Sequence, residues 1–340
     1  MTTLPTPRIP DPMDAPPLRW GILGTGWIAE RFIDTLHKNT RQRLVAVGSR
    51  TESRGKRFAD RFEAERAYGS YEALVEDADV DIVYVATPHS EHRDNALMAI
   101  EAGKPVLVEK AFARTFAEAN EIVDAAGAAG VALMEAMWTR FLPHMDVVRQ
   151  LLEVGALGEI ETVFADHGQW FEQNESSRLF APELAGGAML DLGVYPVSFV
   201  NFVLGAPALA AALGSRAFTG VDRQISAVLG EFPDHPHAQA LISTTLAART
   251  PTVAHISGDK ARIEIPGPFY GPGQISFITR DGEVAVSERP QIEDHGGLCY
   301  EAAHFATMVA EGRTESELMP HDDTLAVMAT MDELVEEGLA

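Results

Sequence analysis

The composition of the chain is that of an ordinary water-soluble protein with room for two domains. Its 340 residues are 46% hydrophobic and 23% charged, and a chain of this length usually divides into two domains with separate cores. The 50 acidic and 27 basic residues give a net charge of -23, which repels polyanions such as DNA, RNA and anionic membranes. The single cysteine, Cys299, forms neither a disulfide framework nor a cysteine zinc cluster and fits a reducing compartment. We therefore expect a cytoplasmic protein that binds neither nucleic acid nor membranes.

The first 17 residues are rich in proline. They contain no apolar core of the kind found in signal peptides, and no apolar run of 18 residues follows them. We expect residues 1–17 to form a disordered arm, and the chain to carry no membrane span and no recognisable export signal.

Residues 18–140 have the pattern of a Rossmann-type domain. Short apolar segments alternate with helical ones, and the expected strands lie in 20–23, 44–50, 81–88, 106–111 and 131–138. Strands that alternate with helices of this length indicate a parallel, doubly wound sheet.

From residue 141 the pattern changes. Segments 160–171, 238–247, 252–265 and 275–288 alternate apolar and polar residues, and helices are expected at 190–204, 299–312 and 321–337. Such alternation is typical of an antiparallel sheet with one face in water or covered by a partner. We expect an α/β protein whose second domain, 141–340, is an α+β domain for substrate binding and dimerisation, with a large, mainly antiparallel open sheet.

A glycine motif, Gly24-x-Gly26-x-x-Ala29, follows the first expected strand and leads into a helix. The glycines allow a tight turn and the close approach of a pyrophosphate to the helix N-terminus. An isolated match is as often an ordinary turn, but the strand before it and the helix after it favour dinucleotide binding. The residues expected to contact the cofactor here are Gly24, Thr25, Gly26, Trp27 and Ile28.

The second expected strand ends in Gly48-Ser49-Arg50, where an NAD enzyme usually has an acid that binds the ribose 2′-hydroxyl. Arg50, with Ser49 and Arg54, can instead bind a 2′-phosphate through its planar fork of donors. NADP is therefore favoured, with NAD possible. The alternative is a solvated, basic start of the next helix.

Two charges, Glu109 and Lys110, come directly after Val106-Leu107-Val108, three apolar residues that are expected to finish a buried strand. Ligands of a doubly wound sheet lie beyond the carboxyl ends of its strands. Lys110 can stabilise charge on a substrate oxygen during hydride transfer, and Glu109 can orient the cofactor ribose or the lysine. A surface Glu-Lys pair is the alternative.

Four segments in order carry a family resemblance: ILGTGWIAERF, VATPHSEH, AGKPVLVEKA and AGGAMLDLGVYPV. From residue 20 onward the chain resembles the glucose-fructose oxidoreductase, inositol dehydrogenase and MocA (Gfo/Idh/MocA) family of nicotinamide-dependent oxidoreductases. MEAMWTRFLP (134–143) and LDLGVY (190–195) resemble the branch that contains dimeric dihydrodiol dehydrogenase and NADP-dependent D-xylose dehydrogenase. The resemblance implies a homodimer or higher homo-oligomer.

The resemblance also implies catalytic residues. Lys110 matches the family's catalytic lysine, Asp191 its motif aspartate, and Tyr195 the tyrosine that this branch carries where many relatives have histidine. The spacing of Asp191 and Tyr195 places both on one helix face. Ala111 departs from the family, which usually has proline after the lysine, joined by a cis bond.

Further positions follow from the same resemblance. His92 falls near the nicotinamide and substrate, and Phe141 belongs to a segment that borders the active site and the subunit contact; packing roles are the alternative for both. The remaining cofactor contacts are expected at Thr87, Pro88, His89, Glu109, Lys110, Trp138 and Arg140. The aromatic pair Trp170 and Phe171 is interpreted as packing, which is the commoner role of two aromatics in an alternating strand, and a sugar-binding wall is the alternative.

The implied chemistry is oxidation of a hydroxyl group. Tyr195 takes the hydroxyl proton, Lys110 stabilises the alkoxide, and Asp191 orients the pair while hydride passes to nicotinamide. Substrates implied by the resemblance are sugars or vicinal diols: an aldopyranose such as D-xylose or D-glucose, or a trans-dihydrodiol. An NAD-cycling glycosidase and a non-catalytic cofactor-binding sensor remain as alternatives. No HExxH motif, cysteine pair or EF-hand pattern is present, so we expect no metal site.

Overall fold

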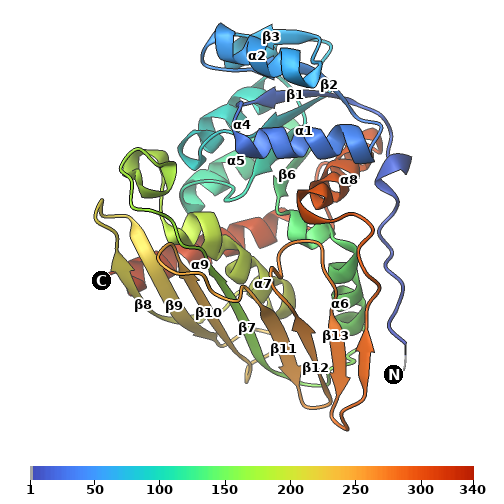
Figure 1. Ribbon diagram of the computed structural model, residues 1–340, viewed down its shortest axis with the longest axis vertical. Helices are drawn as coiled ribbons and strands as arrows, with labels where there is room; N and C mark the ends of the chain where they lie inside the picture. Colours follow the sequence, from blue (N-terminus) through green and yellow to red (C-terminus); the bar gives the residue numbers. More distant parts are fainter. Residues whose placement is uncertain (1–2) are drawn as a thin grey trace. The chain divides into compact units, whose positions relative to one another are not determined.

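The structure is a computed structural model that describes residues 3–340 (Figure 1). The chain divides into two compact units. The Rossmann unit comprises Pro10–Phe141 and Asp294–Thr324, and the sheet unit comprises the residues up to Ile9, Leu142–Glu293 and Leu325–Ala340. The first break falls next to the boundary expected at 140, whereas residues 294–324, expected in the second domain, group with the first sheet. Part of the reason is that Phe305 packs its ring against Trp20 of the first strand.

The Rossmann unit contains a six-stranded sheet in the order β3-β2-β1-β4-β5-β6. All five pairings are parallel, so the expected doubly wound sheet is confirmed. The strands are β1 (Arg19–Leu23), β2 (Arg43–Gly48), β3 (Arg66–Tyr68), β4 (Ile82–Val85), β5 (Val106–Glu109) and β6 (Leu133–Ala136). The strand order reverses between β1 and β4, and ligands of such sheets bind at this switch point.

Helices cover both faces of this sheet (Figure 1). They are α1 (Trp27–Asn39), α2 (Glu52–Phe62), α3 (Tyr71–Val75), α4 (His92–Glu101), α5 (Phe116–Ala129) and α8 (Leu298–Ala310). Helix α1 packs against α8, and α4 against α5. Because parallel crossovers are right-handed, the reversal of strand order puts α1 and α4 on opposite faces. The core includes Phe32 stacked on Tyr84, with ring centroids 3.9 Å apart.

The sheet unit contains an eight-stranded sheet in the order β14-β13-β12-β11-β7-β10-β9-β8. Only the β7–β10 pair of this sheet is parallel, which confirms the expected mainly antiparallel sheet. The strands are β7 (Ile160–Gly168), β8 (Leu209–Arg216), β9 (Asp222–Gly230), β10 (Gln239–Thr245), β11 (Ala254–Gly258), β12 (Ala261–Ile265), β13 (Ser276–Thr279) and β14 (Val284–Val286). Further helices are α6 (Pro143–Glu153), α7 (Val194–Leu204) and α9 (His321–Gly338).

Helix α7 packs on β7 and β10 and is almost entirely buried. A π-helical turn, Met189–Gly193, precedes it, so the helix expected at 190–204 is present in two pieces. The segment Pro182–Leu204 is long and apolar enough to cross a membrane, but 89% of its most apolar window is buried inside the protein. That burial is typical of a core helix.

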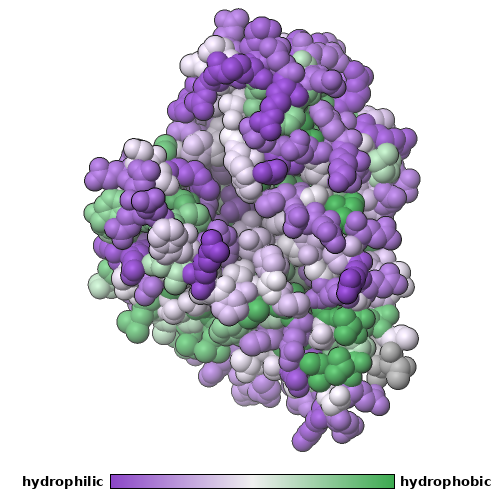
Figure 2. All heavy atoms as spheres, in the orientation of Figure 1, coloured by the Kyte–Doolittle hydropathy of each residue, from purple (hydrophilic) through white to green (hydrophobic). Residues whose placement is uncertain are grey.

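The open face of the eight-stranded sheet exposes apolar side chains. Leu213 on β8 is 82% exposed, and Val228 on β9 lies opposite Leu241 on β10 with both side chains in water. Apolar residues gather over this part of the molecule in Figure 2. The alternation in the sequence therefore corresponds to one covered and one uncovered face.

The expectation that residues 1–17 are disordered is wrong for the described part, residues 3–17. Arg8 donates hydrogen bonds to the buried Asp146 and to Glu153 on α6, and Arg41 donates to the carbonyls of Met13 and Asp14. Polar contacts with distant residues hold this segment, and its proline content limits the entropy lost on ordering.

Candidate active site

The glycine turn after β1 leaves room at the start of α1. Gly24 has φ +107°, and a Cβ there would lie 2.6 Å from the carbonyl oxygen of Ala86, so only glycine fits. A Cβ at Gly26 would meet nothing within 4 Å. Helix α1 begins at the next residue, Trp27, and its free N–H groups face this open space. The residues present fit a dinucleotide pyrophosphate.

Two arginines stand unpaired at the end of β2. Ser49 is buried, whereas Arg50 and Arg54 are exposed, and neither guanidinium makes a hydrogen bond or ion pair with any residue in the range 3–340. Burial raises the pKa of the nearby Tyr71 hydroxyl, and the two arginine charges oppose that rise. Both charges are therefore available to a phosphate group.

Glu109 and Lys110 occupy the carboxyl end of β5, as expected. The Tyr84 hydroxyl donates to Glu109 Oε1, and the Lys110 backbone N–H donates to Glu109 Oε2 at 3.2 Å. Glu109 is buried and Lys110 half-buried, so they are not the solvated surface pair that was the alternative. The Lys110–Ala111 peptide bond is cis.

His92 is fully buried beneath the loop after β4. Its Nδ1 lies 2.9 Å from the Ala111 carbonyl oxygen, and its Nε2 lies 2.9 Å from that of Thr87. Burial lowers the pKa of His92, against the effect of these carbonyls. The ring therefore joins the loop at Thr87 to the backbone after Lys110. This gives His92 a structural role, and its expected contact with substrate stays a prediction.

The other residues of this loop are also held internally. Asn95 donates to Thr87 Oγ1 at 3.1 Å, and Pro88 precedes a short 3-10 turn, His89–Glu91. The His89 ring lies edge-on to the His92 ring, with centroids 5.6 Å apart. Their backbone nevertheless lies beyond the carboxyl end of β4, where a cofactor of this fold binds.

Trp138 and Arg140 have different surroundings. The Trp138 ring lies parallel to the His295 ring at 5.8 Å, and Trp27 approaches the same imidazole edge-on at 4.9 Å. Arg140 is buried, and its Nη1 lies 2.7 Å from Asp323 Oδ2. Trp138 therefore joins an aromatic cluster next to the glycine turn, and the guanidinium of Arg140 makes an internal ion pair. The expected cofactor contacts of both residues stay predictions.

Asp191 and Tyr195 lie in the sheet unit, in the π-helical turn and the first turn of α7. Arg178 Nη2 lies 2.8 Å from Asp191 Oδ1. The Tyr195 ring stacks on Tyr270, with centroids 4.4 Å apart. Both candidate residues are buried, so their side chains are held in place by the unit itself.

The sequence did not single out His167 and Tyr270, which flank Tyr195. The His167 ring centroid lies 5.4 Å from that of Tyr195 and 4.6 Å from that of Tyr270. His167 Nδ1 lies 3.2 Å from the Leu192 carbonyl oxygen, and its Nε2 lies 3.0 Å from Gln169 Nε2. A carbonyl only accepts and an amide NH₂ only donates, so Nδ1 carries the proton and Nε2 accepts.

Tyr270 is the second aromatic neighbour. Burial raises the pKa of its hydroxyl, and the Asp191 charge raises it further, while a hydrogen bond with Gln169 lowers it. The only signal in the sequence for His167 was its place near the end of an alternating strand. For Tyr270, in a loop, there was none.

The structure thus brings the candidates together in two groups. Lys110, Glu109 and the glycine turn belong to the Rossmann unit, and Asp191 and Tyr195 belong to the sheet unit. The expected pairing of Lys110 with Tyr195 joins residues of different units and stays a prediction. Among residues 3–340, no group of three or more His, Cys, Asp or Glu side chains could hold a metal ion.

Comparisons with known proteins give relatives over nearly the whole chain. The D-xylose 1-dehydrogenase (NADP(+)) of Hypocrea jecorina is 36% identical, over 94% of this chain and 92% of its own length. The trans-1,2-dihydrobenzene-1,2-diol dehydrogenase of Xenopus tropicalis is 34% identical, over 94% and 97%.

Solved structures of oxidoreductases have the same fold over nearly the whole chain. An aldose-aldose oxidoreductase from Caulobacter crescentus, complexed with glycerol, has a TM-score of 0.83 and 27% identity, covering 95% of this chain and 98% of its own. A 3-ketoreductase from Actinomadura kijaniata, in complex with NADP and TDP-benzene, has a TM-score of 0.82 and 27% identity with the same coverage.

Family models cover both halves of the chain. Residues 18–137 match the oxidoreductase family with an NAD-binding Rossmann fold, and residues 145–264 match the C-terminal domain of the same family. With relatives above 30% identity over nearly its full length, the chain belongs to the Gfo/Idh/MocA family of oxidoreductases.

Proposed function

We propose that the protein is an NADP-dependent dehydrogenase that transfers hydride between a sugar or vicinal-diol hydroxyl and nicotinamide. The observation that carries the proposal is the 36% identity, over 94% of the chain, to a D-xylose 1-dehydrogenase (NADP(+)). The candidate residues add physical support. The chain has an open helix N-terminus after a glycine turn, two unpaired arginines after β2, and a lysine where β5 ends.

The cofactor is held by the Rossmann unit. The backbone from Gly24 to Ile28 takes the pyrophosphate at the start of α1. Arg50 and Arg54 take a 2′-phosphate, which explains a preference for NADP over NAD, although NAD also fits the turn. When bound, the nicotinamide supplies a hydride acceptor or donor.

The protein's own side chains handle the proton. Tyr195 accepts the hydroxyl proton as the adjacent C–H bond gives up hydride, and the Lys110 ammonium donates a hydrogen bond to the substrate oxygen as negative charge develops there. Asp191, fixed by Arg178, orients the pair. The reverse reduction returns the same proton. The two units must bring Lys110 and Tyr195 to one substrate oxygen.

The substrate class follows from the relatives' names. One relative is named for D-xylose and another for a dihydrobenzene diol, and both names denote rings with neighbouring hydroxyls. We therefore propose a cyclic vicinal diol: an aldopyranose such as D-xylose or D-glucose, or a trans-dihydrodiol. A non-catalytic sensor would need no Lys110, and a glycosidase cycling bound NAD would gain nothing from Arg50.

We also propose that the protein is a homodimer in the cytoplasm. The open sheet face exposes the apolar residues Leu213, Val228 and Leu241. A second copy of the chain packed on this face would remove their side chains from water. Cys299 is buried and free, in keeping with a reducing compartment.

The function is tested with purified protein and a panel of substrates. Absorbance of reduced nicotinamide is recorded with NADP or NAD against D-xylose, D-glucose, inositols and a trans-dihydrodiol. The proposal expects NADP-dependent turnover with a sugar or the dihydrodiol. No turnover with any of them under either cofactor would contradict it.

A further inference from the structure

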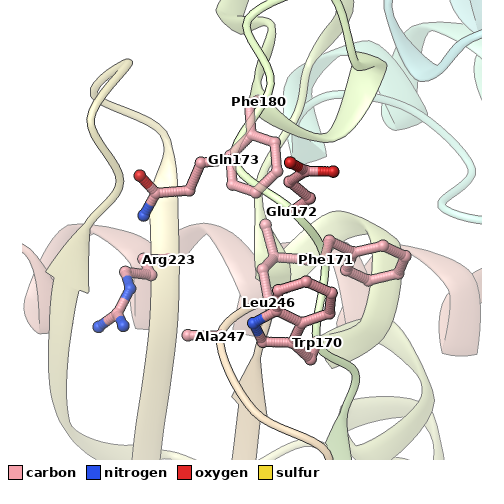
Figure 3. A pocket seen from close by; sticks show the side chains of 8 residues that line it. All are labelled: Trp170, Phe171, Glu172, Gln173, Phe180, Arg223, Leu246 and Ala247. Atoms are coloured by element: carbon pink, nitrogen blue, oxygen red, sulfur yellow. The ribbon is translucent and has the colours of Figure 1, made fainter.

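A pocket of about 270 Å³ lies in the sheet unit, and none of the residues proposed for oxidation lines it. It opens where β7 and β10 end and β9 begins (Figure 3). Its lining residues are Trp170, Phe171, Glu172, Gln173, Phe180, Arg223, Leu246 and Ala247. Pockets for small ligands usually have about 300–1,000 Å³, so this one has room for a single ring.

One wall of the pocket is a tryptophan that stays exposed while its backbone is fixed. Trp170 forms an isolated β-bridge with Ala247, and the N–H of Phe171 donates to the Leu246 carbonyl at 3.0 Å. The Trp170 side chain is nonetheless 59% exposed. Behind it, Phe171, Phe180 and Leu246 pack in one apolar cluster. The fixed backbone thus presents an exposed aromatic ring at the pocket, on which the apolar face of a ligand can pack.

The rim of the pocket carries polar side chains without hydrogen-bond partners among the described residues. The side chains of Glu172, Gln173 and Arg223 make no hydrogen bond or ion pair with any residue between 3 and 340. Arg223 offers only donors, Glu172 only acceptors and Gln173 both. Figure 3 shows these three side chains at the pocket that Trp170 also lines, with the Glu172 carboxylate on the side of Phe180 and the Arg223 guanidinium on the side of Ala247.

The charges at this opening select the class of ligand. Arg223 and Glu172 contribute one positive and one negative charge, so the rim attracts neither a phosphate nor a cation strongly. A neutral ring with several hydroxyls both donates and accepts hydrogen bonds, and its C–H face can pack on an aromatic surface.

We propose that this pocket binds a neutral sugar ring, separate from the ring that is oxidised. The apolar face of the sugar packs on Trp170, and its hydroxyls accept from Arg223 and donate to Glu172 and Gln173. The site goes beyond the proposed function, because none of its residues takes part in hydride or proton transfer.

The experiment follows the indole N–H signals of the full-length protein labelled with ¹⁵N-tryptophan. The four tryptophans give four signals, and the one lost in Trp170→Phe belongs to Trp170. D-Xylose and D-glucose are the probes, with inorganic phosphate for comparison. The proposal expects the Trp170 signal to shift with saturation on adding a sugar and to stay in place on adding phosphate.

A matched pair of arginine variants tests the rim. Arg223→Met should raise the sugar concentration at which the Trp170 shift is half complete about tenfold, the usual effect of losing a charge-assisted hydrogen bond. Arg280→Met removes an exposed arginine of the same unit outside the pocket and should leave the shift unchanged. Sugar titrations that are the same in Arg223→Met and Arg280→Met would overturn the proposal. So would a wild-type Trp170 signal that does not shift with either sugar, or one that shifts with protein concentration and not with sugar concentration.

Failure of this proposal and failure of the proposed function are distinguishable. Lys110→Met removes the proposed catalytic lysine, so it should abolish turnover while the Trp170 signal still responds to sugar. If the wild type turns over normally but its Trp170 signal does not respond to sugar, the sugar-binding proposal fails and the proposed function stands. If the Trp170 signal responds to sugar but the protein has no dehydrogenase activity, the proposed function fails and the sugar-binding proposal stands.

Discussion

Arg178 and Asp191 form an ion pair in which Nη2 of the arginine lies 2.8 Å from Oδ1 of the aspartate. The arginine comes from a short 3-10 turn, Arg178–Phe180, and the aspartate from the π-helical turn before α7. The pair fixes the direction of a buried carboxylate one helical turn before Tyr195. We infer that Arg178 is a positioning residue for the proposed proton transfer.

Arg178→Met should lower kcat about threefold to tenfold, because half of the arginine side chain is in water and a solvated ion pair contributes modestly. Arg178→Lys, which keeps the charge, should recover part of the loss. Steady-state kinetics across pH check the prediction, with an altered pH profile of kcat expected for Arg178→Met. An unchanged kcat and pH profile would show that the pair is only structural.

Arg50→Ala should weaken NADP binding about tenfold or more and leave NAD binding nearly unchanged. The lost contact is a charge-assisted hydrogen bond to the 2′-phosphate, which contributes roughly 1.5–3 kcal/mol. Calorimetric titration with each cofactor measures it. Lys56→Ala, which removes a neighbouring exposed cation on α2, is the control, and equal losses in both variants would refute a specific phosphate contact.

Leu213→Glu should dissociate the proposed homodimer, since it places a charge among the exposed apolar residues of the open sheet face, on its edge strand β8. Light scattering at micromolar protein measures the mass. Val154→Glu is the matched control, because Val154 is also largely exposed but follows α6, outside the sheet. A monomeric wild type, or dissociation of both variants alike, would argue against the open face as the interface.

Glu135→Gln should stabilise the fold increasingly as pH rises from about 4.5 to 7. Burial raises the pKa of Glu135 from 4.5 to about 7, against a hydrogen bond from Thr324. Between these values the folded carboxyl keeps its proton while the unfolded one loses it, so the folded state binds more protons and wild-type stability falls as pH rises. The full difference is about 3 kcal/mol above pH 7.

Urea unfolding of both proteins at pH 4.5 and pH 7.5 measures this difference. The free energies of unfolding should differ little at the lower pH and by a few kcal/mol in favour of Glu135→Gln at the higher one. The same difference at both pH values would mean that Glu135 does not keep its proton when the protein folds.

Much of the fold could be predicted because local patterns determined it. Parallel strands buried on both faces are short apolar runs, as in β4 and β5, and strands with one uncovered face alternate, as in β9. The glycine turn was predictable because Gly24 has a backbone conformation and a close contact that only glycine accepts.

What could not be predicted depended on tertiary contacts. The family motifs drew attention to His92 and Arg140 but did not reveal their burial. His92 contacts the carbonyls of Thr87 and Ala111, and Arg140 pairs with Asp323, far away in the sequence. The order of residues 3–17 depends on contacts such as Arg8 with Asp146, which proline content does not reveal. His295 and Tyr270 meet the candidate residues through packing alone.

The central claim is that Lys110 and Tyr195 act on one substrate oxygen, although they belong to different units. Lys110→Met and Tyr195→Phe should each leave the fold and NADP binding largely intact. Each should also lower kcat roughly a hundredfold to a thousandfold, the usual effect of losing a charge contact made in the transition state, about 2.7–4 kcal/mol.

The most direct test is the kcat of the double variant, Lys110→Met with Tyr195→Phe, beside the two single variants on one verified substrate, with circular dichroism and NADP binding as controls for folding. Because the two groups act as a unit, the double variant should be little worse than either single variant. Near-normal turnover in Lys110→Met, or losses that multiply fully in the double variant, would contradict the claim.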